Sequence, residues 1–110
     1  MGITKTELFT GGQNRIATWA KALGHPARIA ILQYMLKERS CICGSLVDEL
    51  GLAQATISQH LRELKECGLI TGTVEGTSVC YCIEPKAWSK AQTAFNKLFN
   101  KYTPLDTDHC

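Results

Sequence analysis

The sequence predicts a mainly helical fold with one small β-hairpin, and three observations support this. Apolar residues recur at helical spacing near both ends of the chain. Residues 46–70 show the pattern of two short helices joined by a turn at Gly51. Alternating apolar and polar residues flank a Glu-Gly-Thr turn at 75–77, which is typical of two paired strands. At 110 residues, the chain is expected to form one domain with a modest core.

The N-terminal part predicts a loose segment followed by two helices. Residues 1–13 are expected to form a flexible arm. Asn14 can cap a first helix that runs to about Leu23, where a glycine ends it. Pro26 suits the first position of a second helix, which should end near Glu38.

The middle of the chain predicts a pair of helices. The first should end at about Leu50, and the second should span roughly Ala53 to Glu66. Gly68 is placed to terminate the second helix just beyond Cys67. Alanine has no oxygen with which to cap a helix, so Ala53 is expected to leave the start of the second helix slightly destabilised.

Two strands and a last helix follow, and together with the preceding helices they give the order of elements of a winged helix-turn-helix. Strands are expected at 69–74 and 78–83, followed by a last helix from about Lys86 to Tyr102 and a mobile tail at 103–110. Three helices, a turn, a helix, a hairpin and a helix make a winged helix-turn-helix with an extra helix at each end. The domain is therefore assigned to residues 14–102.

The two end helices are more apolar than a chain of this length can easily cover. We expect them to pair with those of a second copy across a two-fold axis, which would make a homodimer. The alternative is that they fold back on their own subunit.

The helix expected at 53–66 has one face that is suited to reading DNA. Ile57, Leu61 and Leu64 form its apolar face, whereas small and hydrogen-bonding side chains with one arginine occupy the other. A face made only for solubility would carry more Glu/Lys pairs. Glutamine can pair with adenine and arginine with guanine, while serine and threonine can hold phosphates or base edges. The residues expected to contact double-stranded operator DNA are Gln54, Thr56, Ser58, Gln59, His60 and Arg62.

Two of the basic residues near this face admit more than one interpretation. His60 flanks the polar stripe and is expected to touch a phosphate, or else to be a surface histidine without a role. Arg28 is expected either to anchor the second helix to its neighbours or to contact the DNA backbone.

Composition and charge exclude several other classes of protein. The net charge of +2 is too small to indicate nucleic-acid binding by itself. No apolar run approaches the ~18–20 residues of a membrane span, and no signal-peptide core is seen at the start, so a cytoplasmic location away from membranes is expected. The chain has no Ser/His/Asp set, no glycine-rich phosphate loop and no separated carboxylate pair. We therefore expect no enzymatic activity and no organic cofactor.

Three segments resemble the ArsR/SmtB family of metal-responsive repressors. LAQATISQHLRELKECGLI, at 52–70, looks like the recognition helix of that family. LGHPARIAIL, at 23–32, is similar to its second helix, and VEGTSVCYCI, at 74–83, to its wing hairpin. The resemblance covers about residues 14–100. It implies a homodimeric winged-helix repressor that leaves its operator when a metal or metalloid ion binds.

A Cys-x-Cys motif points to the ion. Cys41-Ile42-Cys43 resembles the motif of the arsenic- and cadmium-responsive branches of the family. Thiolates select soft ions, so Cys41 and Cys43 are expected to bind As(III) or Sb(III), with Cd(II) or Pb(II) as further possibilities. The alternative is that both are small buried apolar side chains.

Three departures from the family pattern affect the expected metal site and the expected contact of the wing with DNA. Leu46 stands where arsenite-responsive members can carry a third cysteine. The last helix has no histidine and no acidic residue after Glu84, which argues against the site of zinc-responsive members. Thr77 stands at the wing tip where arginine or lysine is common, so strong minor-groove contact by the wing is not expected.

Other cysteines are candidates for a third ligand. If the segment at 40–43 pairs with the second wing strand so that Ile42 lies beside Tyr81, all four cysteines of the two Cys-x-Cys pairs would face outward together. Cys80 or Cys82 could then supply a third thiolate, although unrelated strand cysteines are an equal alternative. Cys110 in the tail could also reach the site, or be an unstructured thiol. Cys67 is expected to lie in the core.

Two further functions stay open at this stage. The chain could be a repressor of the same fold that senses oxidants or sulfur species through a disulfide. A pair spaced by one residue would close a very tight ring, so a disulfide between more distant cysteines would be needed. A different class is also possible: a zinc-stabilised protein-interaction module, or a small thiol oxidoreductase.

Overall fold

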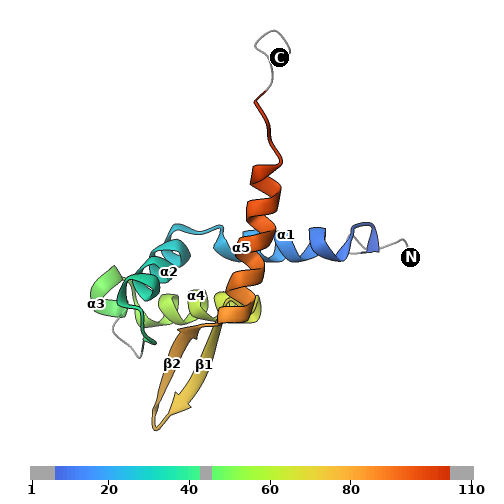
Figure 1. Cartoon of the computed structure of the whole chain (residues 1–110). Helices are drawn as coiled ribbons and strands as arrows, with labels where there is room; N and C mark the ends of the chain where they lie inside the picture. The colour runs from blue at the N-terminus through green and yellow to red at the C-terminus, as the bar shows by residue number, and fades with distance from the viewer. Residues whose placement is uncertain (1–6, 43–45, 105–110) are drawn as a thin grey trace.

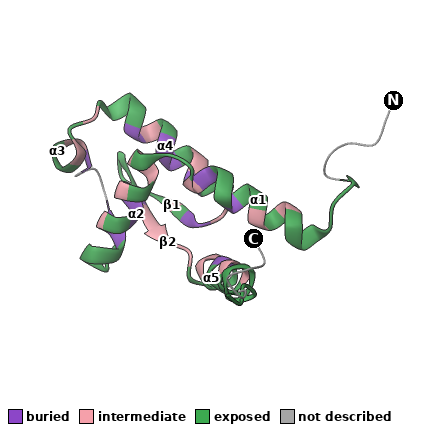
Figure 2. Ribbon diagram, turned by 90° about the horizontal axis from the view of Figure 1, so that it is seen from above, coloured by how far each residue is buried: buried purple, intermediate pink, exposed green. Residues whose placement is uncertain are grey.

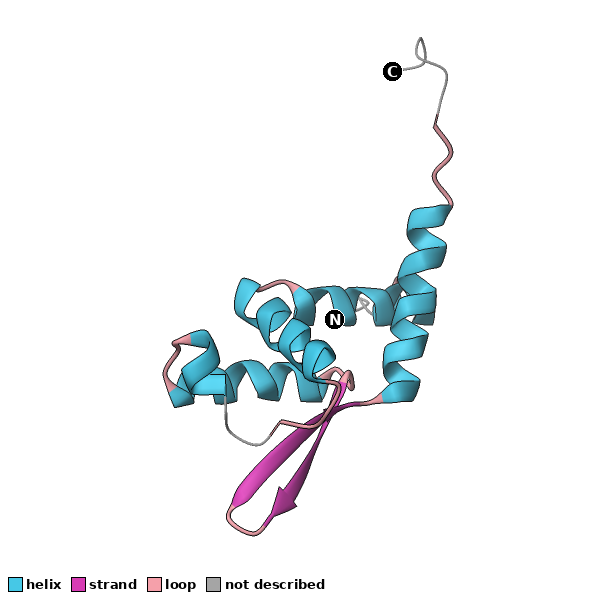
Figure 3. Ribbon diagram, turned by 60° about the vertical axis from the view of Figure 1, so that its left-hand side comes forward, coloured by secondary structure: helices cyan, strands magenta, loops and turns pink. Residues whose placement is uncertain are grey.

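Five helices and a two-stranded sheet make up the computed structural model, which describes residues 7–42 and 46–104. The elements follow one another along the chain in the order shown in Figure 1. Their bounds are α1 Gly11–Leu23, α2 Pro26–Glu38, α3 Leu46–Leu50, α4 Gln54–Glu66, β1 Ile70–Glu75, β2 Ser78–Ile83 and α5 Pro85–Asn100. The hairpin projects away from the helices (Figure 3). The predicted class, mainly helical with a small hairpin, is confirmed.

Helix α1 begins at Gly11, so the prediction that Asn14 caps it is wrong. Thr10 is the N-cap: its Oγ1 accepts a hydrogen bond from the Gln13 N–H at 3.0 Å, and Gln13 Oε1 accepts one from the Thr10 N–H at 3.0 Å. This reciprocal pair is a capping box, which satisfies two backbone donors at the helix start. It allows the helix to begin with two glycines, which are poor helix formers. The division of the chain into arm, domain and tail stays a prediction.

Helices α2 and α4 begin and end close to the predicted positions. Pro26 is the first residue of α2, and the N-cap His25 accepts a hydrogen bond at Nδ1 from the Ala27 N–H at 3.0 Å. The N-cap of α4 is Ala53, whose side chain makes no capping hydrogen bond, as its chemistry requires. Gly51 before α4 and Gly68 after it have φ of +69° and +88°, conformations that other residues rarely adopt.

The wing is an antiparallel hairpin that is joined to the segment before α3. Ile70 pairs with Ile83 at one end and Glu75 with Ser78 at the other. Beyond the hairpin, Ile42 forms a single bridge with Tyr81, in which each backbone N–H donates to the other residue's carbonyl at 2.9 and 2.8 Å. The expected pairing of Ile42 with Tyr81 is therefore confirmed.

Two clusters of buried side chains hold these elements together. The larger one lies among α2, α3, α4 and the hairpin, and its members are Ile31, Leu32, Met35, Ile42, Leu46, Ile57, Leu61, Leu64 and Ile70. The smaller one, Trp19, Leu69 and Ala91, joins α1 and α5 to the rest. Each fully buried aliphatic side chain contributes about 1.5–3 kcal/mol. In Figure 2 buried and exposed segments alternate along α2 and α4, because each helix buries only one face.

Helix α5 ends at Asn100, two residues before the predicted end, so Tyr102 lies outside it and is exposed. Its first turn is fixed by the N-cap Glu84, whose Oε2 accepts a hydrogen bond from the Ala87 N–H at 2.8 Å. Its far half extends beyond the other helices (Figure 1). None of the described helices is long and apolar enough to cross a membrane.

Candidate DNA-binding surface and cysteine site

Helix α4 presents a polar face to solvent. Its buried residues all lie on one side, which packs into the larger core cluster. Five of the side chains expected to contact DNA lie at the surface or near it: Gln54, Thr56, Gln59 and Arg62 are exposed, and Ser58 is half-buried. Gln54 Nε2 donates a hydrogen bond to Ser58 Oγ at 3.2 Å, so these two side chains lie side by side one turn apart. The helix therefore has an accessible row of hydrogen-bonding groups.

His60 is set apart from this row by its burial, which contradicts the alternative that it is a surface histidine. It is only 7% exposed, and its Nδ1 accepts a hydrogen bond from Arg28 Nε at 3.1 Å. Its ring also contacts that of His25, with 4.4 Å between the ring centroids. Position 60 lies at the border between the polar and apolar faces of α4, and the packing of α2 against that border covers it. His60 is therefore less accessible than the other five side chains expected to contact DNA.

Arg28 anchors helices to one another, which decides between the two interpretations of this residue. Besides its bond to His60 in α4, its Nη1 donates to the carbonyl of Ala22 at the end of α1, at 3.2 Å. One guanidinium group therefore joins α1, α2 and α4.

The surroundings of His60 favour its neutral form. Burial is the largest cause that lowers the pKa of His60 from its ordinary value, and the nearby His25 and Arg28 lower it further. Glu63 acts in the opposite direction but does not reverse the shift.

The hairpin supplies little charge with which to hold DNA. Between residues 70 and 83 the sequence has no lysine or arginine. Its exposed side chains near the tip include Val74 and Thr77. A wing of this composition can touch DNA by shape and hydrogen bonds but offers no ion pair to phosphate.

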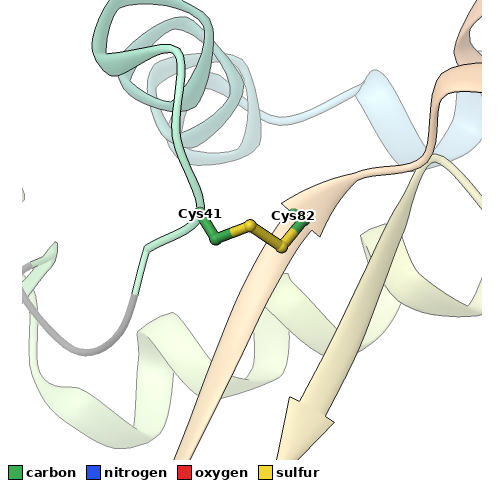
Figure 4. Close-up of a disulfide and its surroundings, with 2 residues drawn as sticks. All are labelled: Cys41 and Cys82. Carbon is green, nitrogen blue, oxygen red and sulfur yellow. A yellow bond between two sulfur atoms is a disulfide. The ribbon is translucent and has the colours of Figure 1, made fainter.

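A disulfide links the second wing strand to the segment before α3. It joins Cys41 to Cys82, which are 41 positions apart in the sequence and have 4.4 Å between their Cα atoms (Figure 4). The two residues flank the Ile42–Tyr81 bridge, so the pairing of backbones brings the sulfur atoms together. Cys41 is exposed and Cys82 is half-buried. Cys82 was only one of several candidate third ligands in the sequence, and the structure places it directly against Cys41.

The other cysteines differ in their accessibility. Cys80 is buried, so the expectation that all four paired cysteines face outward is wrong for this residue. Cys67, the free thiol among the described cysteines, is half-buried, and its Sγ donates to the Leu64 carbonyl at 3.2 Å. Burial raises the pKa of Cys67, which favours the protonated thiol over the thiolate. Cys43 and Cys110 lie outside the described residues.

Among the described residues, Cys41 and Cys82 bring two sulfur atoms side by side. The described residues contain no group of three or more His, Cys, Asp or Glu side chains that could hold a metal ion. Once reduced, Cys41 and Cys82 would supply two adjacent sulfur ligands, the donor type that soft ions prefer.

Comparisons with known proteins agree with the fold. A family model described as bacterial regulatory protein, arsR family, matches residues 25–71. The HTH-type transcriptional regulator CmtR of Mycobacterium tuberculosis is 34% identical over 96 residues, which cover 87% of this chain and 78% of that protein. The HTH-type transcriptional repressor SmtB of the same species is 41% identical over 61 residues, covering 56% of this chain and 44% of that protein.

Solved structures show the same architecture. An ArsR-like transcriptional regulator from Rhodococcus sp. RHA1 superposes with a TM-score of 0.68 at 22% identity, over 84% of this chain and 86% of that chain. The transcriptional repressor BigR from Xylella fastidiosa superposes with a TM-score of 0.61 at 26% identity, over 94% of this chain and all of that chain. The winged-helix fold is thereby confirmed.

Proposed function

The chain belongs to the ArsR family of bacterial regulatory proteins, and we propose that it is a homodimeric repressor released from its operator by a thiophilic ion. Its relatives are transcriptional regulators, so DNA binding and not catalysis is its activity. The observation that carries the proposal is the exposed polar row on α4, opposite the buried face of the same helix.

In a dimer, this row can read DNA in two places. Two such helices related by a two-fold axis enter successive major grooves about 34 Å apart. Gln54 and Gln59 are suited to adenine and Arg62 to guanine. Thr56 and Ser58 can hold phosphates or base edges. The operator is therefore expected to be an inverted repeat.

The DNA-binding part is tested on a DNA fragment taken from upstream of the chain's own coding sequence. Arg62→Ala should weaken binding in fluorescence anisotropy by about 1–3 kcal/mol, because a contact to a base edge is lost. Lys65→Ala is the matched control: it removes the same charge from the same helix, but near the C-terminal end, away from the bases. Equal losses in the two variants would refute base reading by Arg62.

For the inducer, the proposed ligands are Cys41 and Cys43, with Cys82 as a third. The adjacency of Cys41 and Cys82 supports a thiol site between the wing and the start of the helix pair. Arsenite or antimonite is the favoured ion, because As(III) and Sb(III) are soft and accept thiolate ligands. An ion held there would move the helix pair relative to the wing, so that the two α4 helices no longer match both grooves. Such linkage typically amounts to ~1–3 kcal/mol, or about 5–150-fold in DNA affinity.

The test is a titration of the reduced protein–DNA complex with arsenite, antimonite, cadmium, lead and zinc in turn. One of the soft ions should release the DNA, and a Cys41→Ser, Cys43→Ser double variant should stay bound. Cys67→Ser, which removes a thiol that faces the core, should respond as the unaltered protein does. Release of the double variant at the same ion concentration would end the metal-site proposal.

A second candidate function is favoured by the disulfide itself. Cys41 and Cys82 bond across the Ile42–Tyr81 bridge, so the longer-range pair that thiol sensing needs is present. Oxidation by hydrogen peroxide would convert the two thiols to a disulfide and the hydrogen peroxide to two molecules of water, with two electrons passing from sulfur to oxygen. The bond would fasten the wing to the segment before α3.

The effects of hydrogen peroxide and of arsenite on DNA binding distinguish the two candidate functions. If the protein is an oxidant sensor, hydrogen peroxide should change the DNA affinity of the reduced protein, Cys82→Ser should abolish the change, and arsenite should have no effect. If it is an ion sensor, arsenite or another soft ion should release the DNA without any disulfide detectable by mass spectrometry.

A further inference from the structure

Three helices meet at one cluster of polar groups, which we name the Arg28 junction; within it His60 is buried, Arg28 is half-buried and His25 is exposed. The junction consists of Arg28, His60, His25 and the carbonyl of Ala22. Arg28 donates to His60 in the middle of α4 and to Ala22 at the end of α1. His25, the N-cap of α2, lies with its ring against that of His60. This junction is therefore the polar link between α2 and the helix that carries the DNA-reading row.

The hydrogen bond between Arg28 and His60 requires a neutral His60 ring. Nδ1 of His60 accepts from Arg28 Nε, so this nitrogen must carry a lone pair and the proton must lie on Nε2. A protonated imidazole has an N–H at both positions and cannot accept. Arginine stays charged at all relevant pH values. Protonation of His60 would thus place two donors and two positive charges against each other.

We propose that neutral His60 is a positioning residue for DNA binding, which holds α4 against α2 through Arg28, and that its protonation loosens α4 and weakens sequence-specific binding. The proposal rests on the proposed DNA-binding function. His60 touches no DNA itself; it lies between Gln59 and Arg62 on the same helix, so a rotation or shift of α4 at this point moves both of them together.

Most of the charged and titratable groups around His60 oppose a positive charge on its ring. From the α2 side, His25 and Arg28 both oppose a positive charge on His60, as does its burial, and together these factors lower its pKa. Glu63, on α4 itself, favours the charge. The Cys67 thiol lies within the electrostatic reach of Arg28, and α1 contributes a backbone carbonyl to the junction. The switch should therefore act on the acid side of the ordinary histidine range.

The change in operator affinity that we expect on acidification is opposite to the change that net charge alone would cause. Acidification makes a protein more positive, which strengthens its attraction to phosphate and its binding to any DNA sequence. Opening of the junction should instead weaken binding to the operator. A fall in specific affinity at low pH therefore points to positioning and not to net charge.

The experiment compares three proteins by fluorescence anisotropy between about pH 8 and pH 5.5 at constant ionic strength. The probes are the fragment from upstream of the chain's own coding sequence and an unrelated fragment of the same length. His60→Asn keeps an oxygen that can accept from Arg28 but cannot titrate. His25→Asn is the matched control, because asparagine keeps the N-cap of α2 and leaves His60 able to titrate.

We expect the unaltered protein to lose about tenfold in affinity for the upstream fragment at the acid end, in line with the loss of one charged hydrogen bond. His60→Asn should bind normally at pH 8 and keep its affinity on acidification, while His25→Asn should still lose affinity. An affinity of the unaltered protein that stays level or rises at low pH would overturn the proposal. So would an equal fall in His60→Asn.

A measurement without DNA separates this proposal from the proposed function. The Arg28 Nε–H signal is followed by NMR in the unaltered protein, together with the titration of the His60 ring. The signal should lose its hydrogen-bonded shift in step with that titration. A shift that persists after His60 is protonated would overturn the proposal. Failure of the upstream fragment to bind at pH 8 would instead count against the proposed operator, and the NMR titration would still decide whether the junction opens.

Discussion

At the scale of single residues, Ala53 leaves the first turn of α4 without a side-chain cap. Its backbone already has the extended conformation of an N-cap, with φ −64° and ψ 148°, and the side chain is exposed. A serine at this position could accept a hydrogen bond from one of the free N–H groups of the first turn without displacing a neighbour. The helix that carries the DNA-reading row is therefore less stable than it could be.

Ala53→Ser should raise the free energy of unfolding by about 0.5–2 kcal/mol, measured by urea denaturation. Ala55→Ser is the control: it lies within the first turn, where serine caps nothing and is a weaker helix former than alanine. That variant should be unchanged or slightly less stable. Equal stabilisation by both variants would show that capping is not the cause.

At the scale of elements, the wing depends on the close approach of Tyr81 to Gly72. These two residues face each other across the hairpin. A Cβ atom added at Gly72 would lie 3.1 Å from Cε1 of Tyr81 and 3.5 Å from Cγ1 of Val79. Tyr81 also forms the bridge to Ile42, so a displaced ring would disturb the link between the wing and the segment before α3.

Gly72→Val should therefore lower the free energy of unfolding by about 1–3 kcal/mol, the usual cost of overpacking. Urea denaturation measures it, and Thr73→Val is the control because threonine and valine have nearly the same shape and this position is exposed. A tolerated valine at position 72 would mean that the Tyr81 ring moves aside freely.

At the scale of the whole molecule, several exposed apolar side chains lie near the two ends of the chain, in addition to others on α2 and the hairpin. The C-terminal part of α5 exposes Leu98 and Phe99, which are 54% and 67% accessible. Leu8 and Phe9 are exposed just before α1. The proposed two-fold interface would cover such side chains on the last helix and next to the first.

Phe99→Glu should therefore give a monomer in sedimentation velocity. The aromatic contact is lost twice in a symmetric dimer, so the dissociation constant should rise about a hundredfold or more. DNA affinity should fall with it, because one subunit offers a single helix. Asn96→Glu adds the same charge to the same helix at a polar exposed position and should stay dimeric. A dimeric Phe99→Glu would place the interface elsewhere.

The stability of the whole fold should also depend on the protonation of His60. Its pKa in the folded protein lies below the ordinary value of 6.5. Between these two values the unfolded chain binds more protons, so stability rises with pH. The contribution of His60 is complete above about pH 6.5 and is lost as the pH falls through the folded pKa.

Thermal unfolding should consequently show a lower midpoint at about pH 5.5 than at pH 7.5. The difference should be smaller in His60→Asn, which has no titratable group at this position. A midpoint difference that is the same in both proteins would assign the pH dependence to the carboxylates.

The periodicity of the sequence predicted most of the element boundaries because those signals are local. Pro26, Gly51 and Gly68 act on their own stretch of backbone, and all three stand where a helix begins, turns or ends. The start of α1 was missed because its cap depends on the reciprocal bonding of Thr10 with Gln13, which outweighs the unfavourable glycines between them. The end of α5 was placed late because its apolar pattern continues to Tyr102 after the helix has stopped.

By itself, the sequence determined the winged-helix order and the polar row on α4, since periods of 3.6 and 2 assign faces within each element. The packing of separate elements decided the rest. It buried His60 against Arg28, 32 positions away, and bonded Cys41 to Cys82, 41 positions away. A residue at the edge of a helical face can turn toward solvent or core, and the neighbouring helix makes that choice. Likewise, Cys41 can form a disulfide only because the fold places the strand that carries Cys82 beside it.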